Sequence, residues 1–113
     1  MKEQRKQKRY PLNKTIQAIN MLDGRSLGIL INISAGGFMT MCGENSPKRG
    51  DILQLHLLDA REKSLDITAG ATCVWQEEAH ASNSYWCGFK FIDVSPDTLE
   101  VLNAFLRDLE ENN

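Results

Sequence analysis

Residues 15–33, which read TIQAINMLDGRSLGILINI, decide the fold class of this chain. Two runs rich in β-branched and apolar residues, 15–22 and 26–33, flank an Asp23-Gly24 pair. Asp-Gly between two such runs is a strong hairpin signal, so the stretch predicts two paired antiparallel strands. A period of two then places one set of second-run side chains on the core face: Leu27, Ile29, Ile31 and Ile33.

Four more strands are expected downstream, separated by short turns. They cover residues 37–42, 51–58, 64–76 and 85–92. In the run 64–76, alternate residues from Leu65 to Trp75 share one face, and Gly70 midway indicates a bulge or bend. Six short strands of this kind predict an antiparallel barrel or sandwich, because closure removes exposed strand edges.

The end of the chain changes to a helical period. Ser95-Pro96 is typical of an N-cap followed by proline at the first helical position. The residues that form an apolar stripe at helical spacing are Leu99, Leu102, Leu106 and Leu109, with Phe105 beside them. We expect a basic arm at residues 1–13, a barrel at 14–94, and a helix at 95–111 that covers one barrel mouth; a dimerisation face is the alternative use of the stripe.

Length and composition restrict the class of protein. A chain of 113 residues supports one domain. No apolar run approaches the roughly 20 residues of a membrane span, and the N-terminus lacks the apolar stretch of a signal peptide. Cys42, Cys73 and Cys87 lack the short paired spacing of a zinc site and are expected to be buried, reduced thiols. We expect a cytoplasmic protein with no membrane insertion.

Charge and catalytic residues narrow the function further. Residues 1–14 carry a formal charge of +5. Since the net charge of the chain is −2, the remaining residues carry −7. A basic arm on an acidic body favours a local anionic partner, whereas a DNA-binding protein is more often basic over a whole face. The two histidines, His56 in an apolar strand and His80 in a polar loop, fall in no recognisable catalytic arrangement. The pair Glu77-Glu78 follows a strand and is interpreted as a solvated turn rather than as a paired catalytic carboxylate. We therefore expect no enzymatic activity.

Two short motifs remain as candidates for binding. Arg5 and Arg9 form R-x-x-x-R, and each guanidinium offers a planar fork of donors for phosphate or for the O6/N7 edge of guanine. Taken alone, this motif is better interpreted as a solvated arm.

The second motif is Asn32-Ile33-Ser34-Ala35-Gly36-Gly37, at the end of a strand. A period of two places Asn32 and Ser34 side by side and away from the core, while Gly36 and Gly37 can adopt positive φ and let a ligand approach the backbone. Two interpretations are open. The side chains read a base edge or ribose oxygens, or they satisfy backbone groups in an ordinary strand-end turn.

Together, R-x-x-x-R, a gap of 22 residues, and N-x-S-x-x-G resemble the signature of the PilZ domain family, and the resemblance covers essentially the whole chain. It implies a six-stranded antiparallel β-barrel with a C-terminal α-helix that binds cyclic di-GMP and needs no cofactor. Arg5 and Arg9 would clamp phosphate and guanine, Asn32 and Ser34 would contact a guanine, and Gly37 would allow a tight approach. Asn stands here where the family more commonly has Asp, which implies a somewhat lower affinity.

Three further residues enter through the same resemblance. Trp75 is a candidate to stack on an exposed guanine; the other interpretation is a core tryptophan that shares the face of Ile67 and Cys73. Gln4 and Lys8 flank the arginines and are candidates to influence how many ligand molecules bind.

The expected function is a cyclic di-GMP receptor that changes conformation on binding and relays the signal to an unidentified downstream protein, as a monomer or weak homodimer. A ligand-independent interaction adaptor with the same barrel is the alternative, and the intact motif residues argue against it. A small nucleic-acid binder is a third possibility. The acidic body and the absence of aromatic residues among the arginines argue against that one.

Overall fold

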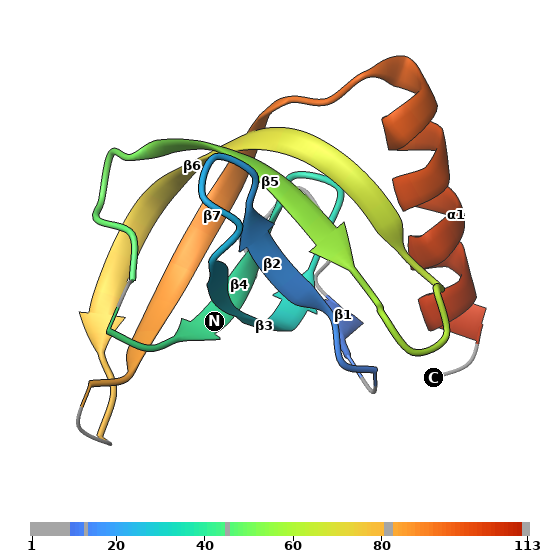
Figure 1. The fold of residues 1–113 in the computed structure, drawn as a ribbon. Coiled ribbons are helices and arrows are strands. Elements are labelled where there is room, and N and C mark those ends of the chain that lie inside the picture. Colours follow the sequence, from blue (N-terminus) through green and yellow to red (C-terminus); the bar gives the residue numbers. More distant parts are fainter. Residues whose placement is uncertain (1–9, 13, 45, 81–82, 112–113) are drawn as a thin grey trace, which may run out of the picture.

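The computed structural model describes residues 10–12, 14–44, 46–80 and 83–111. In these residues the chain forms seven strands followed by one helix (Figure 1). The elements are β1 (Tyr10–Pro11), β2 (Gln17–Asn20), β3 (Ser26–Ile33), β4 (Gly37–Cys42), β5 (Ile52–Leu58), β6 (Asp66–Glu78), β7 (Tyr85–Asp93) and α1 (Pro96–Glu111).

The sheet closes on itself through β3. Strands β2, β5, β6, β7 and β4 are hydrogen-bonded in that order, and β3 pairs with both β2 and β4. All these pairings are antiparallel, so β2 to β7 form a six-stranded antiparallel barrel, and the predicted fold class is confirmed. The short strand β1 pairs with the end of β3 beyond β2, with Tyr10 opposite Ile33 and Pro11 opposite Asn32.

The predicted hairpin joins β2 to β3. The Gly24 N–H donates to the Asn20 carbonyl over 2.7 Å, and the Asn20 N–H donates to the Arg25 carbonyl over 2.9 Å. Gly24 has φ of 74°, in the left-handed region that side chains other than glycine rarely adopt. The Asp23 carboxylate accepts the Arg25 N–H and completes the turn. The Asp-Gly signal was therefore a sound basis for the first strand pair.

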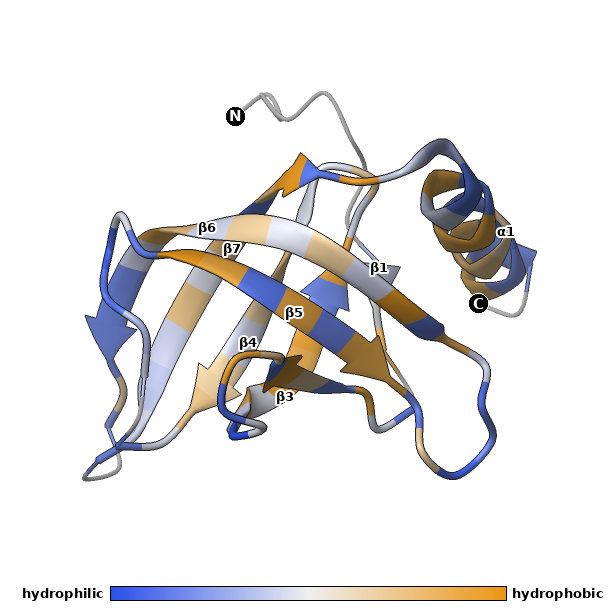
Figure 2. Ribbon diagram, turned by 45° about the horizontal axis from the view of Figure 1, so that its top comes forward, coloured by the Kyte–Doolittle hydropathy of each residue, from blue (hydrophilic) through white to orange (hydrophobic). Residues whose placement is uncertain are grey.

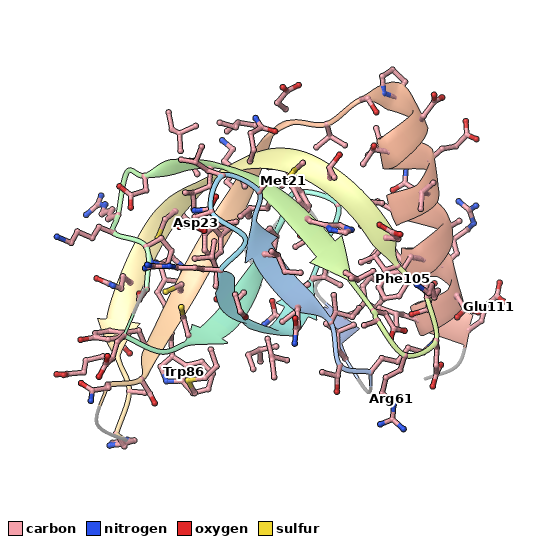
Figure 3. All side chains as sticks on the ribbon, in the orientation of Figure 1. Met21, Asp23, Arg61, Trp86, Phe105 and Glu111 are labelled. Carbon is pink, nitrogen blue, oxygen red and sulfur yellow. The ribbon has the colours of Figure 1, made fainter. Side chains whose placement is uncertain are left out.

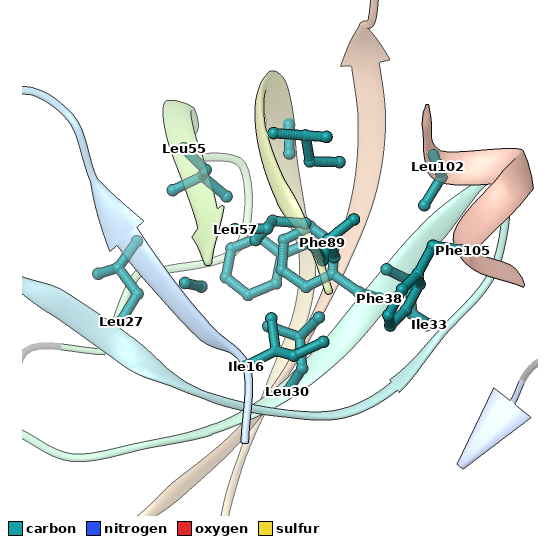
Figure 4. Packing of buried hydrophobic residues seen from close by; sticks show 14 of the residues in the cluster. Ile16, Leu27, Leu30, Ile33, Phe38, Leu55, Leu57, Phe89, Leu102 and Phe105 are labelled. Carbon is teal, nitrogen blue, oxygen red and sulfur yellow. The ribbon is translucent and has the colours of Figure 1, made fainter. Parts of the chain in front are cut away.

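The core lies inside the barrel and continues onto the helix (Figure 4). At its centre the rings of Phe38 and Phe89 stack with centroids 4.8 Å apart. Hydrophobic and hydrophilic residues alternate along much of the strands, as expected when one face of each strand is buried (Figure 2). The helix lies beside one end of the barrel and buries four residues in the same cluster: Leu102, Phe105, Leu106 and Leu109.

The helix begins as predicted, but its buried stripe is shorter. The Ser95 hydroxyl accepts the Thr98 N–H over 3.1 Å, which is an N-cap at the residue before Pro96. Leu99 was expected to belong to the stripe and is instead 40% exposed. The first turn of α1 follows directly on the connection from β7 (Figure 1), and Leu99 is not among the residues of the core cluster.

The expected core face of β3 is wrong at two of its four positions. Leu27 and Ile33 are buried, but Ile29 and Ile31 are 45% and 37% exposed, and Leu30 is buried in their place. The pairing of β3 with β2 shifts register between Ser26 and Ile29, which turns Ile29 outward and Leu30 inward. The pairing with β4 shifts again between Leu30 and Asn32, which leaves Ile31 outside and returns Ile33 to the core. Gly28, with φ of 110°, lies so close to β4 that a Cβ would be 2.1 Å from the Met41 carbonyl oxygen.

Two segments expected to be irregular form strands. Tyr10–Pro11, which was assigned to the arm, forms β1 on the edge of β3. Glu77 and Glu78 were expected in a solvated turn and instead extend β6, where they are exposed and pair with Trp86 and Tyr85. In both cases the partner strand supplies the backbone hydrogen bonds, and local residue preference does not reveal such a partner.

Candidate functional site

The residues of the arginine motif precede the described part of the chain. Arg5 and Arg9, together with Gln4 and Lys8, fall outside the described residues. The first described residue is Tyr10, which follows Arg9 directly and pairs with β3 next to Asn32. The segment that carries both arginines therefore joins the barrel beside the second motif, although the two motifs are 22 residues apart in the sequence.

Asn32 lies at the end of β3, just after the bulge. Its side chain is half-buried, and its Nδ2 donates to the Met39 sulfur over 3.6 Å across the β3–β4 pair. Ile33, which follows it, points into the core and is fully buried. Asn32 therefore presents its amide on the outer surface of the barrel, as the period-two interpretation predicted.

Ser34 is not beside Asn32 on that surface. It is 3% exposed, its hydroxyl accepts the N–H groups of Gly36 and Gly37 over 3.2 Å each, and it donates to the Gly37 carbonyl over 3.3 Å. The expectation that both polar side chains face away from the core is wrong for Ser34. Its hydroxyl holds the turn between β3 and β4, because buried backbone groups there need partners.

The two glycines of the motif also differ from expectation. Neither Gly36 nor Gly37 has positive φ. Gly37 is buried, and a Cβ on it would be 2.0 Å from the Phe89 carbonyl oxygen, so glycine is required by the close approach of β7. The Gly36 carbonyl accepts the Phe91 N–H over 2.9 Å. Both glycines therefore hold the turn after Asn32 against β7, Gly37 by close packing and Gly36 by a hydrogen bond.

Trp75 lies on the outer face of the barrel, and the core interpretation is wrong. It is 39% exposed, whereas Cys73 is buried, because the β6–β7 pairing shifts register between Cys73 and Trp75. Trp75 pairs with Gly88, and its indole occupies the space that a side chain there would fill: a Cβ on Gly88 would be 2.1 Å from the indole Nε1. The indole therefore lies against the β7 backbone.

The barrel pairing connects these residues in one row across four strands. Asn32 pairs with Met39, Met39 with Gly88, and Gly88 with Trp75. At a spacing of about 4.8 Å between strands, the backbones of Asn32 and Trp75 are about 14 Å apart, and the indole extends back over β7. The row places an amide, a thioether and an indole on one outer surface, and we call these four residues the cross-strand row.

Two positions in this region were not identified as site residues from the sequence. Gly88 leaves room for the indole, and Lys90, exposed two residues further along β7, brings a positive charge to the same face beside Gly37. The signal that could have found them is a glycine between two core-facing residues, Cys87 and Phe89, opposite a tryptophan. The outer surface around the row is apolar, with contributions from Ile29, Ile31, Met41 and Trp86.

Groups that could do other chemistry lie away from this row. Cys42, Cys73 and Cys87 are free, buried thiols, as predicted, and burial raises the pKa of Cys42 and of Cys73 to about 11. His56 is half-buried on β5 and lies 2.6 Å from the Asp66 carboxylate. Among the described residues, no group of histidine, cysteine and acidic side chains could hold a metal ion. No helix in the described part of the chain is long and apolar enough to cross a membrane.

Comparison with the profiles of known protein families shows to which family the chain belongs. The PilZ domain profile matches residues 3–108, which is nearly the whole sequence. This chain belongs to the PilZ domain family. The match includes both arginines and the Asn-x-Ser-x-x-Gly turn, so the resemblance noted from the two motifs is confirmed. No curated protein matches this PilZ domain sequence.

Solved structures share the fold at low sequence identity. The PilZ domain of Escherichia coli YcgR with c-di-GMP superposes with a TM-score of 0.75 at 18% identity, over 97% of this chain and 94% of that one. Bacillus subtilis MotI, an inhibitor of motility, gives 0.70 at 17% identity, over 96% of this chain and 53% of its own. The complex of K. pneumonia MrkH with c-di-GMP gives 0.73 at 17% identity, over 95% and 52%. This PilZ domain thus spans about half of the MotI and MrkH chains.

Proposed function

We propose that this PilZ domain is a non-catalytic receptor that binds cyclic di-GMP on the outer face of the barrel, changes conformation on binding, and relays the signal to a partner protein. The observation that carries the proposal is the cross-strand row. It begins at Asn32, next to the strand β1 that directly follows Arg9, and it ends at Trp75. Two similar structures, of YcgR and MrkH, contain c-di-GMP.

The charges of the ligand match this surface. Cyclic di-GMP carries two phosphates and two guanines, so it needs cations for the former and hydrogen-bonding or stacking groups for the latter. In the proposal Arg5 and Arg9 supply bidentate donors to phosphate and to a guanine edge. Lys90 adds a positive charge from β7, on the face where the row lies. Gln4 and Lys8 are proposed to influence the number of ligand molecules bound.

Of the remaining motif residues, one is proposed to contact the ligand and another to hold the turn beneath it. Asn32 is proposed to hydrogen-bond a guanine with its amide. Ser34, whose hydroxyl is buried in the turn, is proposed to act by holding Gly36 and Gly37 beneath the ligand, so that the guanine approaches the backbone closely. Trp75 is proposed to stack on the second guanine, because its indole is held against β7 and the residue is 39% exposed.

Isothermal calorimetry tests the proposal with cyclic di-GMP, GTP and single-stranded DNA as ligands. We expect selective binding of the dinucleotide, lost in Arg9→Ala and retained in Arg25→Ala. Arg25 is a matched control, since it lies in the β2–β3 turn, seven residues from Asn32 and about 23 Å away along the strand. Absence of dinucleotide binding by the wild type would favour the ligand-independent adaptor. Strong, salt-sensitive DNA binding would favour the nucleic-acid binder.

Tryptophan fluorescence tests the stacking step separately. The chain has two tryptophans: Trp75 lies on the outer face of β6, and Trp86 lies on the outer face of β7, two residues before Gly88 and next to the buried Cys87 (Figure 3). Stacking on guanine at Trp75 predicts ligand-induced quenching that persists in Trp86→Phe and disappears in Trp75→Phe. Quenching that follows Trp86 instead would contradict the assignment.

A further inference from the structure

The strand β1 is held between the binding motif and the end of the helix. Tyr10 and Pro11 pair with Ile33 and Asn32 of β3. On its other side, the Tyr10 hydroxyl donates to the Glu110 carboxylate over 2.5 Å, which joins residues 100 positions apart. Figure 1 shows β1 near the C-terminal end of α1, at the same end of the barrel.

Both partners of this hydrogen bond belong to well-packed parts of the fold. The Tyr10 side chain packs against the core cluster. Glu110 follows Leu109, which is 5% exposed and belongs to the same cluster. The hydrogen bond to the carboxylate raises the pKa of Tyr10 above its ordinary value, which fits a phenol that donates to Glu110. The contact therefore connects two anchored elements rather than two free side chains.

We infer that Tyr10 is a positioning residue for the ligand site. Together with Glu110 it fixes, beside Asn32, the point at which the chain continues from Arg9, and it couples ligand binding to the last turn of α1. The inference rests on the proposed function for its ligand but on the described residues for its geometry. Its elements are the β1–β3 pairing and the Tyr10–Glu110 hydrogen bond.

The physical reason is conformational entropy, because a backbone dihedral that is fixed before the ligand binds does not have to be fixed at the binding step. Arg9 is adjacent to Tyr10, so a fixed Tyr10 leaves fewer backbone dihedrals to be restricted when the ligand binds. Pre-organisation of this kind strengthens binding without any new contact to the ligand. The coupling is reciprocal: if contact at α1 favours the anchored Tyr10, then ligand binding favours the anchored end of α1 by the same factor. Ligand binding would thereby stabilise the last turn of α1, and a partner protein that contacts this turn would respond to the ligand.

The first test uses the protein without ligand. Hydrogen exchange is compared for wild type, Tyr10→Phe, Glu110→Ala and Glu110→Gln, with Tyr85→Phe as the matched control. Tyr85 also packs against the core but lies on β7, where it pairs with Cys42 and Glu78. We expect faster exchange at residues 32–33 and 106–111 in Tyr10→Phe and Glu110→Ala, and near wild-type rates in Tyr85→Phe. Unchanged exchange in the first two variants would overturn the anchor.

The second test adds cyclic di-GMP. We expect the Kd to rise about threefold to tenfold in Tyr10→Phe and in Glu110→Ala, as for the loss of one hydrogen bond. Glu110→Gln should recover most of that loss, because its amide oxygen still accepts. The double variant Tyr10→Phe/Glu110→Ala should be no weaker than either single one, since both remove the same contact. Additive losses would contradict the coupling.

The ligand response of the helix completes the test. Ligand should increase protection at residues 106–111 in the wild type and do so less in Tyr10→Phe. If the ligand-free results hold and the wild type binds no cyclic di-GMP, the proposed function fails and the positioning role fails with it, whereas the anchor stands. If the wild type binds and the two variants bind equally well, the positioning role alone is refuted.

Discussion

Replacing Gly88 with alanine should push Trp75 away from the barrel surface. The new methyl group would lie 2.1 Å from the indole Nε1, 2.5 Å from Cε2 and 2.7 Å from Cδ1. Non-bonded carbon atoms need about 3.5–4.0 Å, so the indole must move outward by about 1.5 Å. Overpacking of this kind costs about 1–3 kcal/mol of folding stability, and each kcal/mol lowers the Tm of a domain this size by about 4 °C.

The same displacement should weaken ligand binding. Stacking of a base on an aromatic side chain contributes about 1–3 kcal/mol, which corresponds to an increase of about 5- to 150-fold in the Kd of cyclic di-GMP. Calorimetry measures the Kd, thermal unfolding measures the Tm, and a red shift of tryptophan emission reports the exposed indole. The proposal requires all three to change together.

Gly43→Ala is the matched control, because among the described residues a Cβ there meets only the Asn83 carbonyl oxygen, at an ordinary 3.8 Å. It should leave the Kd and the tryptophan emission near their wild-type values. If Gly88→Ala behaves like Gly43→Ala in all three measurements, the indole does not lie on β7 and the cross-strand row is refuted. If stability falls but the Kd does not, the packing is right and the stacking role of Trp75 is wrong.

Three predictions concern the barrel itself. The Thr40 hydroxyl is buried with no hydrogen-bond partner among the described residues, so Thr40→Val should stabilise the fold by about 1 kcal/mol in urea unfolding; Thr40→Ser, which keeps the hydroxyl, should not. The Ser64 hydroxyl and the Glu62 N–H donate to Asp59 and lower its pKa to about 2. Stability should therefore be lost as the pH falls from about 4 through about 2, and Asp59→Asn should remove this part of the pH dependence; an unchanged slope would refute the role of Asp59. With pKa values raised to about 11, the Cys42 and Cys73 thiols should react with a thiol reagent at pH 8 only as fast as the protein opens, and rapid labelling of native protein would contradict their burial.

Residue pattern was a reliable guide where the structure depends on near neighbours. The Asp23-Gly24 turn and the Ser95 N-cap are made by groups within a few residues of one another, and both form as expected. The strand expected at residues 85–92 also forms, as β7 (Tyr85–Asp93), and within it the buried Cys87 and Phe89 alternate as a period of two requires. The family signature was visible for the same reason, because R-x-x-x-R and N-x-S-x-x-G are short patterns at a recognisable separation.

Pattern was a poor guide wherever a bulge changed the face of a strand. Ile29 and Ile31 alternate in sequence as core residues do, yet two register shifts in β3, one against β2 and one against β4, leave them exposed. Trp75 continues the alternation of Cys73, yet the shift in β6 moves it outward. A bulge is a mismatch between two strands, so the sequence of either strand alone does not locate it.

The sequence by itself determined a run of antiparallel strands that ends in a helix, and it carried two motifs that resemble those of the PilZ family, because strand and helix preferences depend on residues near one another in the chain. The strand pattern left a barrel and a sandwich both open. Only the tertiary structure decided that Ser34 is buried in a turn, that Trp75 lies over Gly88 in one row with Asn32, and that Tyr10 meets Glu110. These relations depend on register and closure, which bring together residues as many as 100 positions apart. Closure of the barrel is a property of all its strand pairs at once, and no single segment carries it.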